Sequence, residues 1–298
     1  MSGVPQGSVL GPLLFVIFIN DLPESVTSCV KLYADDTKIF SPISGEDDKT
    51  LLQSDLNVAY EWSKLWLLEF NLQKCLVMHF GSKNPKFSYK MGSVEIVTTT
   101  RERNLGIIFS SDLKWKEHVI TCAAKANSIL GLIKKNFVNF DIKLIRILYT
   151  VYVRPLIEFA VPVWNPSLQG DIDLLEKIQH RVTRMVHDLR VIPYEERLKY
   201  LNLSILEERR VRGDLIQVFK IFNGFEKVEL CNTPIFKSNL STRGHSQRYA
   251  REICTNNARY NFLTNRIAKE WNELPLEVLF SKTVNEFKAK LDKCMNEL

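Results

Sequence analysis

Residues 30–40 read Val-Lys-Leu-Tyr-Ala-Asp-Asp-Thr-Lys-Ile-Phe, and they are the best guide to the fold of the first part of the chain. Apolar and β-branched residues flank its centre on both sides, a pattern that predicts a β-hairpin with Asp35 and Asp36 at the tip. Two carboxylates on a tight turn suit Mg²⁺, which takes hard oxygen ligands and combines one or two carboxylates with substrate phosphates. The alternative is an ordinary turn, because aspartate favours turns through its local hydrogen bonds.

A second motif precedes the hairpin: Pro5, Gln6 and Gly7 form a short loop ahead of an apolar run over residues 9–19. Proline fixes φ and glycine lacks a Cβ, so the backbone of this loop can pass close to a sugar or a base. The amide of Gln6 offers a donor and an acceptor, which suits a nucleotide edge. The alternative is a helix-entry turn with Ser8 as the cap and a proline in the first turn. We expect the apolar run to be an amphipathic core helix, and it is far too short to cross a membrane.

The order of these motifs resembles a known family. Residues 2–15 read SGVPQGSVLGPLLF, residues 19–22 read INDL and residues 33–36 read YADD. This series resembles the reverse transcriptases of non-LTR retrotransposons, most closely the jockey-like long interspersed elements. The resemblance implies an α+β fold, with a partial right-hand polymerase palm (an antiparallel sheet with helices) followed by a mostly α-helical thumb and C-terminal region. The expected parts are the partial palm over residues 1–110, a helical thumb-like region over 111–225, and a basic loop with C-terminal helices over 226–298.

The resemblance further implies RNA-directed DNA synthesis, in which the 3′-hydroxyl of a DNA primer attacks the α-phosphate of a dNTP on an RNA template. Asp35 and Asp36 would be the catalytic residues and would hold Mg²⁺. The positions implied to contact nucleotide or template are Pro5, Gln6, Gly7, Tyr33 and Lys74. For Lys74, which would approach the triphosphate, the alternative is a lysine at a helix C-terminus that complements the helix dipole.

In this family a further catalytic aspartate and the fingers lie upstream of the Pro-Gln-Gly loop. The sequence begins at Met1, inside the second motif, so we expect the polypeptide alone to lack part of the metal site and to be inactive. Three interpretations stay open: part of a competent polymerase, a non-catalytic nucleic-acid-binding remnant, and a translated pseudogene product with no selected role or an interaction scaffold derived from a retroelement. We also expect marginal stability in the palm region, because an unpaired sheet edge invites aggregation.

Charge is unevenly spread along the chain. Residues 1–108 contain 10 Lys and Arg against 12 Asp and Glu, whereas the remaining residues contain 30 against 22. A basic second half suits contact with a phosphate backbone. Lys177, Arg181 and Arg184 fall at i, i+4 and i+7 of a predicted helix over residues 171–189, so they share one face that can follow a nucleic-acid backbone. The alternative is a solvated basic face on a bundle helix.

The six cysteines are scattered and include no Cys-x-x-Cys pair, which argues against a zinc ribbon and a disulfide framework. The apolar run near the start lacks a basic leader and ends in Asn20-Asp21, unlike a signal peptide. We therefore expect a protein of the nucleus or cytoplasm that is not secreted. Further expectations are helices over 49–71, 118–137, 142–157 and 207–222, with the charges of 207–212 paired along their helix, and strands over 76–80 and 103–109.

Overall fold

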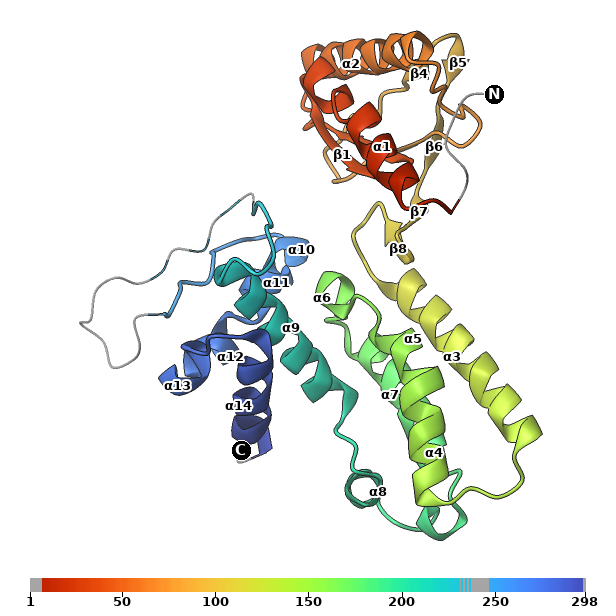
Figure 1. Cartoon of the computed structure of the whole chain (residues 1–298), viewed down its shortest axis with the longest axis vertical. Helices are drawn as coiled ribbons and strands as arrows, with labels where there is room; N and C mark the ends of the chain where they lie inside the picture. Colours follow the sequence, from red (N-terminus) through yellow and green to blue (C-terminus); the bar gives the residue numbers. More distant parts are fainter. Residues whose placement is uncertain (1–6, 231, 233, 235, 237–246, 297–298) are drawn as a thin grey trace. The chain divides into compact units, whose positions relative to one another are not determined.

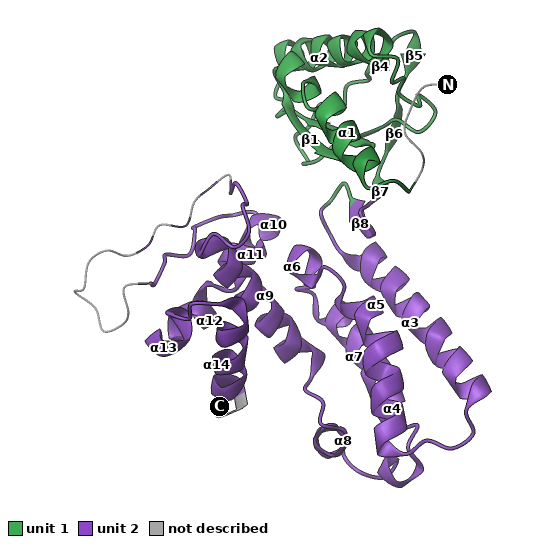
Figure 2. Cartoon of the chain, in the orientation of Figure 1, with its two compact units in different colours: residues 1–102, 110–112 green, residues 103–109, 113–298 purple. Residues whose placement is uncertain are grey.

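The computed structural model of the chain describes residues 7–230, 232, 234, 236 and 247–296. The chain forms two compact units, coloured separately in Figure 2. Unit 1 comprises residues 1–102 and 110–112, and unit 2 comprises residues 103–109 and 113–298. Helices and short strands occur together, as expected for an α+β protein, whereas the three-part division stays a prediction. Of the expected site residues, Pro5 and Gln6 lie outside the described residues, as do residues 243–246 of the basic loop.

Unit 1 holds two main helices and a set of short strands (Figure 1). Its elements are α1 (Leu10–Ile19), a 3₁₀ turn (Leu22–Ser25), β1 (Cys29–Tyr33), β2 (Asp36–Phe40), α2 (Glu46–Leu65), β3 (Leu76–Met78), β4 (Lys90–Met91), β5 (Val94–Glu95) and β6 (Val97–Thr99). The strands pair in twos: β1 with β2 and β4 with β5 antiparallel, and β3 with β6 parallel. The expected hairpin at residues 30–40 is therefore confirmed.

The long helix α2 ends at Leu65, well before residue 71, where the apolar pattern places its end. Leu67 adopts a left-handed φ of +54°. The N–H of Leu67 donates to the carbonyl of Lys64 (3.2 Å), and the N–H of Leu68 donates to that of Ser63 (2.9 Å). These two bonds form a Schellman motif, whose left-handed position is usually a glycine. Because leucine stands there instead, the sequence gives no sign of the stop.

The prediction of a single strand over residues 103–109 is wrong. Leu105 and Gly106 both have positive φ, +46° and +87°. Two consecutive left-handed residues are typical of a type I′ hairpin turn. The segment therefore splits into β7 (Arg101–Asn104) and β8 (Ile107–Ser110), which pair with each other.

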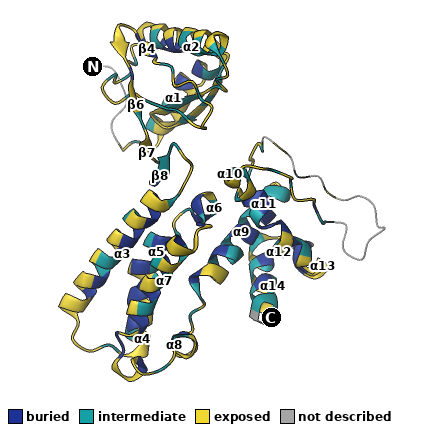
Figure 3. Ribbon diagram, turned by 180° about the vertical axis from the view of Figure 1, so that it is seen from behind, coloured by how far each residue is buried: buried dark blue, intermediate teal, exposed yellow. Residues whose placement is uncertain are grey.

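Helix α1 is not the core helix that its apolar sequence predicts. Within its described length, the buried residue is Ile19, at the C-terminal end. Large apolar side chains along the rest of the helix are exposed: Leu10, Leu13, Leu14, Val16, Ile17 and Phe18. Figure 3 shows how burial varies along each element. Ile19 belongs to the small core formed with Leu22, Ala59 and Trp62, and the half-buried Phe15 packs against it.

Unit 2 is almost entirely helical (Figure 1). Its helices are α3 (Lys116–Asn136), α4 (Ile142–Leu148), α5 (Arg154–Glu158), α6 (Val161–Trp164), α7 (Gln169–Thr183), α8 (Tyr194–Leu201), α9 (Leu206–Phe222), α10 (Asn257–Tyr260), α11 (Leu263–Arg266), α12 (Ala268–Glu273), α13 (Leu276–Leu279) and α14 (Val284–Asn296), with a 3₁₀ turn at His187–Leu189. Across the described ranges of both units, no helix combines the length and the apolar character that a bilayer crossing requires.

The helical run expected over residues 142–157 contains one irregular turn. A π-helical turn, Tyr149–Val153, joins α4 to α5. Four buried side chains, those of Ile145, Tyr149, Val153 and Ile157, recur along this run at intervals of four. A row with this spacing faces the main apolar core of unit 2, to which all four belong.

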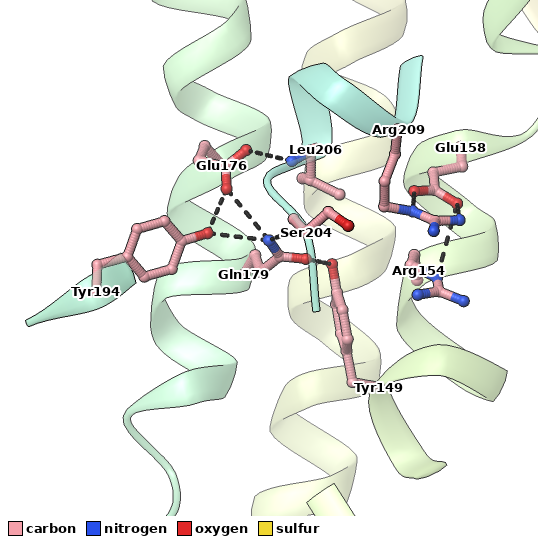
Figure 4. A network of polar contacts seen from close by, with 9 residues as sticks. All are labelled: Tyr149, Arg154, Glu158, Glu176, Gln179, Tyr194, Ser204, Leu206 and Arg209. Atoms are coloured by element: carbon pink, nitrogen blue, oxygen red, sulfur yellow. Dashed lines mark hydrogen bonds and ion pairs between the residues drawn. The ribbon is translucent and has the colours of Figure 1, made fainter. Parts of the chain in front are cut away.

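A buried polar network fixes the helices around α7 (Figure 4). The hydroxyl of Tyr149 donates to the side-chain oxygen of Gln179 (2.5 Å), and the amide nitrogen of Gln179 donates to the carbonyl of Ser204 (2.9 Å). The carboxylate of Glu176 accepts from the N–H of Leu206 at the start of α9 (3.0 Å). Because buried polar groups are costly unless they are hydrogen-bonded, these contacts specify one arrangement of the helices.

Helix α9 links the two apolar clusters of unit 2. Leu206 packs in the first cluster and Phe219 in the second. Between them lies Asp214, only 1% exposed. Its carboxylate accepts from both Nε (2.8 Å) and Nη2 (2.7 Å) of Arg266, and also from the amide of Asn165 (2.8 Å). Asp214 therefore joins three segments that are far apart in sequence.

We predict that Asp214→Ala destabilises unit 2 by about 3–5 kcal/mol, because it leaves the largely buried Arg266 guanidinium without its carboxylate. Urea unfolding followed by far-UV circular dichroism measures this change. The matched control is Glu208→Ala, an exposed acid on the same helix, which should change stability by less than about 0.5 kcal/mol. Equal effects of the two substitutions would show that the Asp214 contacts do not hold the clusters together.

Candidate metal centre

The candidate site lies at the tip of the β1–β2 hairpin in unit 1. The strands pair in register from Cys29 opposite Phe40 to Tyr33 opposite Asp36, which leaves Ala34 and Asp35 as a two-residue loop. Ala34 has a left-handed φ of +49°, a conformation that is uncommon for residues with a Cβ. Asp35 and Asp36 are both exposed. The hairpin therefore presents two adjacent carboxylates to solvent from a short, regular turn.

Asp55 on α2 anchors the base of this hairpin. Its carboxylate accepts from the N–H groups of Thr27 (3.0 Å) and Ser28 (2.8 Å), directly before β1, and from the Thr27 hydroxyl (3.0 Å). Asp55 is only 4% exposed. Burial by itself would raise its pKa, but the hydrogen bonds from Ser28 and Thr27 together hold the pKa of the Asp55 carboxyl below its usual value.

The INDL segment reaches the same helix. The indole N–H of Trp62, on α2, donates to the carboxylate of Asp21 (3.2 Å). Leu22 and Trp62 are buried together, and Leu32 and Ile39 from the inner face of the hairpin pack against them. The INDL segment and the β1–β2 hairpin thus both pack on one face of α2. This packing fixes the position of the turn that carries Asp35 and Asp36.

The remaining expected nucleotide-contacting residues are not joined to the aspartates by side-chain bonds. Lys74 is exposed in a turn just before β3, where its N–H donates to the carbonyl of Asn71 (2.9 Å). Among the described residues, no hydrogen bond or ion pair connects Lys74 with Asp35 or Asp36. Tyr33 is 63% exposed at the end of β1. The structure therefore brings together Tyr33, Asp35 and Asp36 and leaves the place of Lys74 in the site as a prediction.

Of the loop before α1, the structure describes Gly7 and Ser8. Gly7 has a φ of +86°, and a Cβ built there would meet nothing within 4 Å, so the glycine serves the backbone conformation rather than a close contact. The hydroxyl of Ser8, one residue before the N-cap Val9, accepts from the N–H of Gly11 (3.1 Å) in the first turn of α1. The helix-entry role is therefore realised, and a nucleotide role for Gly7 stays a prediction.

The donor set of the hairpin suits Mg²⁺. Carboxylate oxygens are hard ligands, and Mg²⁺ in nucleotide enzymes is held by one or two carboxylates together with substrate phosphates and water. In the part of the chain that the structure describes, no cluster of three or more His, Cys, Asp or Glu side chains is placed to hold a metal. A metal ion held by Asp35 and Asp36 would therefore need further oxygen ligands from elsewhere.

The basic stripe is present on the surface of unit 2. Lys177 and Arg181 lie on α7 and Arg184 is its C-cap, and all three side chains are exposed. Arg181 donates to the side-chain oxygen of Asn127 on α3 (2.7 Å). The three side chains predicted to share one face are therefore all exposed, and a contact with nucleic acid stays a prediction.

Unit 2 contains a buried thiol–imidazole pair. The Sγ of Cys122 lies 3.4 Å from Nε2 of His118, whose Nδ1 accepts from the N–H of Ile108 (3.2 Å). Burial, aided by Lys125 and Arg103, lowers the pKa of His118 to about 4, and burial raises the pKa of Cys122. Neither a thiolate nor a cationic imidazole is favoured, so this pair does not have the character of a nucleophile and base.

Comparison with known proteins agrees with these motifs. Residues 1–118 match the family model described as reverse transcriptase (RNA-dependent DNA polymerase). The chain is similar to the reverse transcriptases of non-LTR retrotransposons. The matched residues include the whole β1–β2 hairpin, together with the 3₁₀ turn at Leu22–Ser25 and helix α2, against which the hairpin packs.

Three relatives come from fruit flies. The probable RNA-directed DNA polymerase from transposon BS of Drosophila melanogaster is 26% identical over 235 residues, covering 70% of this chain and 25% of the relative. The RNA-directed DNA polymerase from mobile element jockey of Drosophila funebris is 26% identical over 202 residues, covering 62% and 22%. The jockey polymerase of Drosophila melanogaster is 32% identical over 91 residues, covering 28% and 10%. The chain thus spans a quarter or less of the length of these relatives, and no solved structure matches it.

Sequence reasoning missed Asp55, although its carboxylate holds the residues directly before β1. The available signal was an acidic residue among the apolar positions of the helix after the hairpin, between Leu52 and Leu56. A charged side chain on an inward face has to find donors. Thr27 and Ser28, polar residues just ahead of a predicted strand, were the nearest candidates along the chain.

We predict that Asp55→Asn loosens the hairpin by about 2 kcal/mol, because it replaces bonds to a charged acceptor. Amide hydrogen exchange in β1 and β2 should speed up roughly 30-fold, since about 1.4 kcal/mol corresponds to a factor of ten. The folded-state pKa of Asp55 is depressed, so its contribution is present at neutral pH and is lost as the pH falls through the folded value, below about 3.8.

The control is Asp47→Asn, an exposed acid in the first turn of the same helix. This variant should leave exchange in the hairpin unchanged. The Asp55→Asn protein should also show a flatter loss of hairpin protection on acidification than the unaltered protein. Identical acid profiles for the two would contradict the anchoring role.

Proposed function

We propose that the chain acts in RNA-directed DNA synthesis, with Asp35 and Asp36 holding Mg²⁺ where a nucleotide is added to a primer. The observation that carries the proposal is the exposure of both carboxylates at the tip of a hairpin whose base is fixed by Asp55. The names of the relatives support the same chemistry. In this proposal unit 1 contributes part of a polymerase palm, and the helices of residues 111–225 form the thumb-like part.

The partners would be an RNA template, a DNA primer and a dNTP, in the nucleus or cytoplasm where such templates occur. Bound Mg²⁺ would stabilise the attacking and leaving oxygens of an in-line displacement. Asp35 and Asp36 would fix the position of that charge relative to the primer end. Tyr33, beside them on the hairpin, would offer its exposed ring to the nucleotide. Lys74 would place an ammonium near the developing charge of the pyrophosphate.

We predict that Asp35→Asn and Asp36→Asn each weaken divalent metal binding by at least about tenfold, because each removes one of two anionic ligands. Titration of the purified chain with Mn²⁺, followed by electron paramagnetic resonance of the free ion, measures this affinity. Asp47→Asn removes an exposed carboxylate of the same unit and should leave the affinity unchanged. If all three variants bind Mn²⁺ as the unaltered chain does, the hairpin is not the metal site.

Primer extension then tests the reaction itself. The purified chain is supplied with an RNA template, an annealed DNA primer, dNTPs and Mg²⁺. Incorporation that is lost in Asp35→Asn and kept in Asp47→Asn supports catalysis by the hairpin, whereas incorporation that survives in Asp35→Asn refutes it. Metal binding without incorporation would support only the metal site, and the second candidate below would then be preferred.

A second candidate is nucleic-acid binding without catalysis. The exposed stripe of Lys177, Arg181 and Arg184, together with the basic charge of the second half of the chain, favours it. Contacts of this kind release counterions from the phosphate backbone and make the affinity depend on salt.

We predict that replacing all three stripe residues by Gln lowers the slope of log affinity against log salt for single-stranded RNA by about 2, roughly 0.7 for each lost phosphate contact. Filter binding at several salt concentrations gives the slope. The matched control replaces Lys134, Lys135 and Lys143, three exposed lysines of unit 2, and so removes the same charge from elsewhere. Equal slopes for the two triple variants would mean that only net charge matters.

A further inference from the structure

Arg251, in the loop that leads into α10 (Figure 1), contrasts with the paired arginines of α9. Arg209 pairs with Glu158 on α5. Arg212 pairs with Asp292 on α14. The expectation that the charges at the start of α9 pair along their helix is therefore wrong. Arg251 is exposed, and its guanidinium has no ion pair or hydrogen bond within the part of the chain that the structure describes.

The guanidinium of Arg251 lies over the ring of Tyr260, with 3.6 Å between its Cζ atom and the ring centroid. The negative face of an aromatic ring attracts a cation, and the planar guanidinium group can stack on it. Tyr260 is still 45% exposed in spite of this cover. The Arg251–Tyr260 pair is therefore a surface that is partly aromatic, partly cationic and open to solvent.

A buried asparagine on α11, Asn265, anchors the two segments that carry this pair. Its side-chain oxygen accepts from the N–H of Glu252 (3.1 Å), and its side-chain nitrogen donates to the carbonyl of Arg259 (2.9 Å). Asn265 is only 3% exposed, and Glu252 and Arg259 also form an ion pair. Arg251 directly precedes Glu252, and Tyr260 directly follows Arg259. The pair thus stands on an anchored backbone, which needs less ordering when a ligand binds.

Positive charge is concentrated around the pair. Residues 251–269 contain four Lys and Arg against one Asp or Glu, a net charge of +3, whereas the whole chain has a net charge of +6. The one acid, Glu252, is already paired with Arg259. Asp214 pairs with Arg266 from outside the stretch, and the sum is still positive when this acid is included. A polyanion is the partner that such a stretch attracts.

An exposed ring beside an unpaired guanidinium suits a nucleotide. Bases stack on aromatic rings and on guanidinium planes, and an arginine also binds the phosphate that joins two nucleotides. In a duplex both faces of a base are covered by its neighbours, so the partner has to be single-stranded. Asn257, on α10 with Tyr260, is exposed, and its side-chain amide bonds no described residue. Such an amide offers a donor and an acceptor to a ribose 2′-hydroxyl, which favours RNA over DNA.

We propose that the Arg251–Tyr260 pair is a docking surface for single-stranded RNA, on which an unpaired base stacks while the adjoining phosphate contacts Arg251. This role rests on the proposed nucleic-acid binding by the chain, and it adds to unit 2 a contact that the stripe of Lys177, Arg181 and Arg184 does not provide. The stripe supplies charge alone, whereas the pair also supplies a stacking face. Catalysis by the hairpin is not required.

The first test is filter binding of a short uridine-rich RNA to the full chain at several salt concentrations. Tyr260→Leu should weaken binding at least about fivefold at every salt concentration, because it removes a stacking face but no charge. Tyr260→Phe keeps the ring and should bind as the unaltered chain does. Tyr152→Leu, which alters another exposed tyrosine of unit 2, should do the same. Equal binding by Tyr260→Leu and Tyr152→Leu would refute the stacking role.

The contribution of Arg251 is read from the salt dependence. Arg251→Gln should lower the slope of log affinity against log salt by about 0.7, the value for one phosphate contact with a single strand. Lys282→Gln removes one exposed charge of unit 2 outside the stretch and should leave the slope unchanged. Equal slopes for these two variants would refute the phosphate contact. Far-UV circular dichroism of each variant shows whether its helices are intact.

Photo-crosslinking locates the contact without any substitution in the protein. RNA that contains 5-iodouridine is irradiated in complex with the unaltered chain, since this base couples to aromatic side chains on which it stacks. Trypsin cleaves after Arg259 and Arg266, so residues 260–266 form one peptide, which contains Tyr260 and Phe262. Mass spectrometry should find crosslinked RNA on this peptide. Crosslinks confined to other peptides would overturn the proposal.

Two further ligands complete the experiment. Tyr260→Leu should leave the affinity for duplex RNA unchanged, because the faces of paired bases are not available to the ring. Single-stranded DNA of the same sequence should bind more weakly than the RNA, and equal binding would contradict the assignment to RNA. If the unaltered chain and Tyr260→Leu bind RNA equally well, the docking surface is refuted and nucleic-acid binding elsewhere on the chain stands. If the unaltered chain binds no RNA, both are refuted.

Discussion

The carboxylate of Asp55 and the two backbone N–H groups it accepts from form the contact on which unit 1 depends. A two-stranded hairpin has little stability of its own, and the paired strands of unit 1 are each joined to one neighbour. What fixes the β1–β2 pair is its attachment to α2, through Asp55 at the base and through the apolar packing of Leu32 and Ile39 around Trp62. Asp35 and Asp36 are therefore exposed at the tip of a hairpin whose base is fixed against α2.

The helices of unit 2 are held in place by a different combination of contacts. Its helices enclose two apolar clusters, and polar contacts inside them select one packing among many. Glu176 and Gln179 tie α7 to its neighbours, while the pair of Asp214 and Arg266 ties α9 to the C-terminal helices. Buried charges of this kind contribute little net stability compared with apolar replacements, but removal of one partner is costly. Specificity of arrangement, rather than added stability, is what they provide.

The sequence predicts features that follow from a regular pattern, and it misses those that depend on a single backbone angle or a distant partner. The alternation around Asp35 and Asp36 predicts the hairpin, and the 3.6-residue stripe predicts α2, yet the end of α2 at Leu65 is missed because a leucine occupies the left-handed position. The turn between β7 and β8 is missed for the same reason, because a leucine, Leu105, occupies a left-handed position there. The bond between Asp55 and Thr27 joins residues 28 apart, and the apolar pattern of α1 does not reveal that most of its side chains are exposed. Such outcomes depend on tertiary context, which local patterns do not contain.

The π-helical turn at Tyr149–Val153 sets the phase of the helical run in which it lies. Residues spaced by four in a regular α-helix drift by about 40° at each step, or about 120° from Ile145 to Ile157, yet all four members of this row are buried. One wide turn takes up part of that drift and keeps the row aligned with the core. The backbone geometry of this segment therefore matters as much as its side chains. An ordinary α-helix over the same residues would leave Ile157 about 120° from the direction of Ile145, carrying Ile157 away from its neighbours and Glu158 away from Arg209.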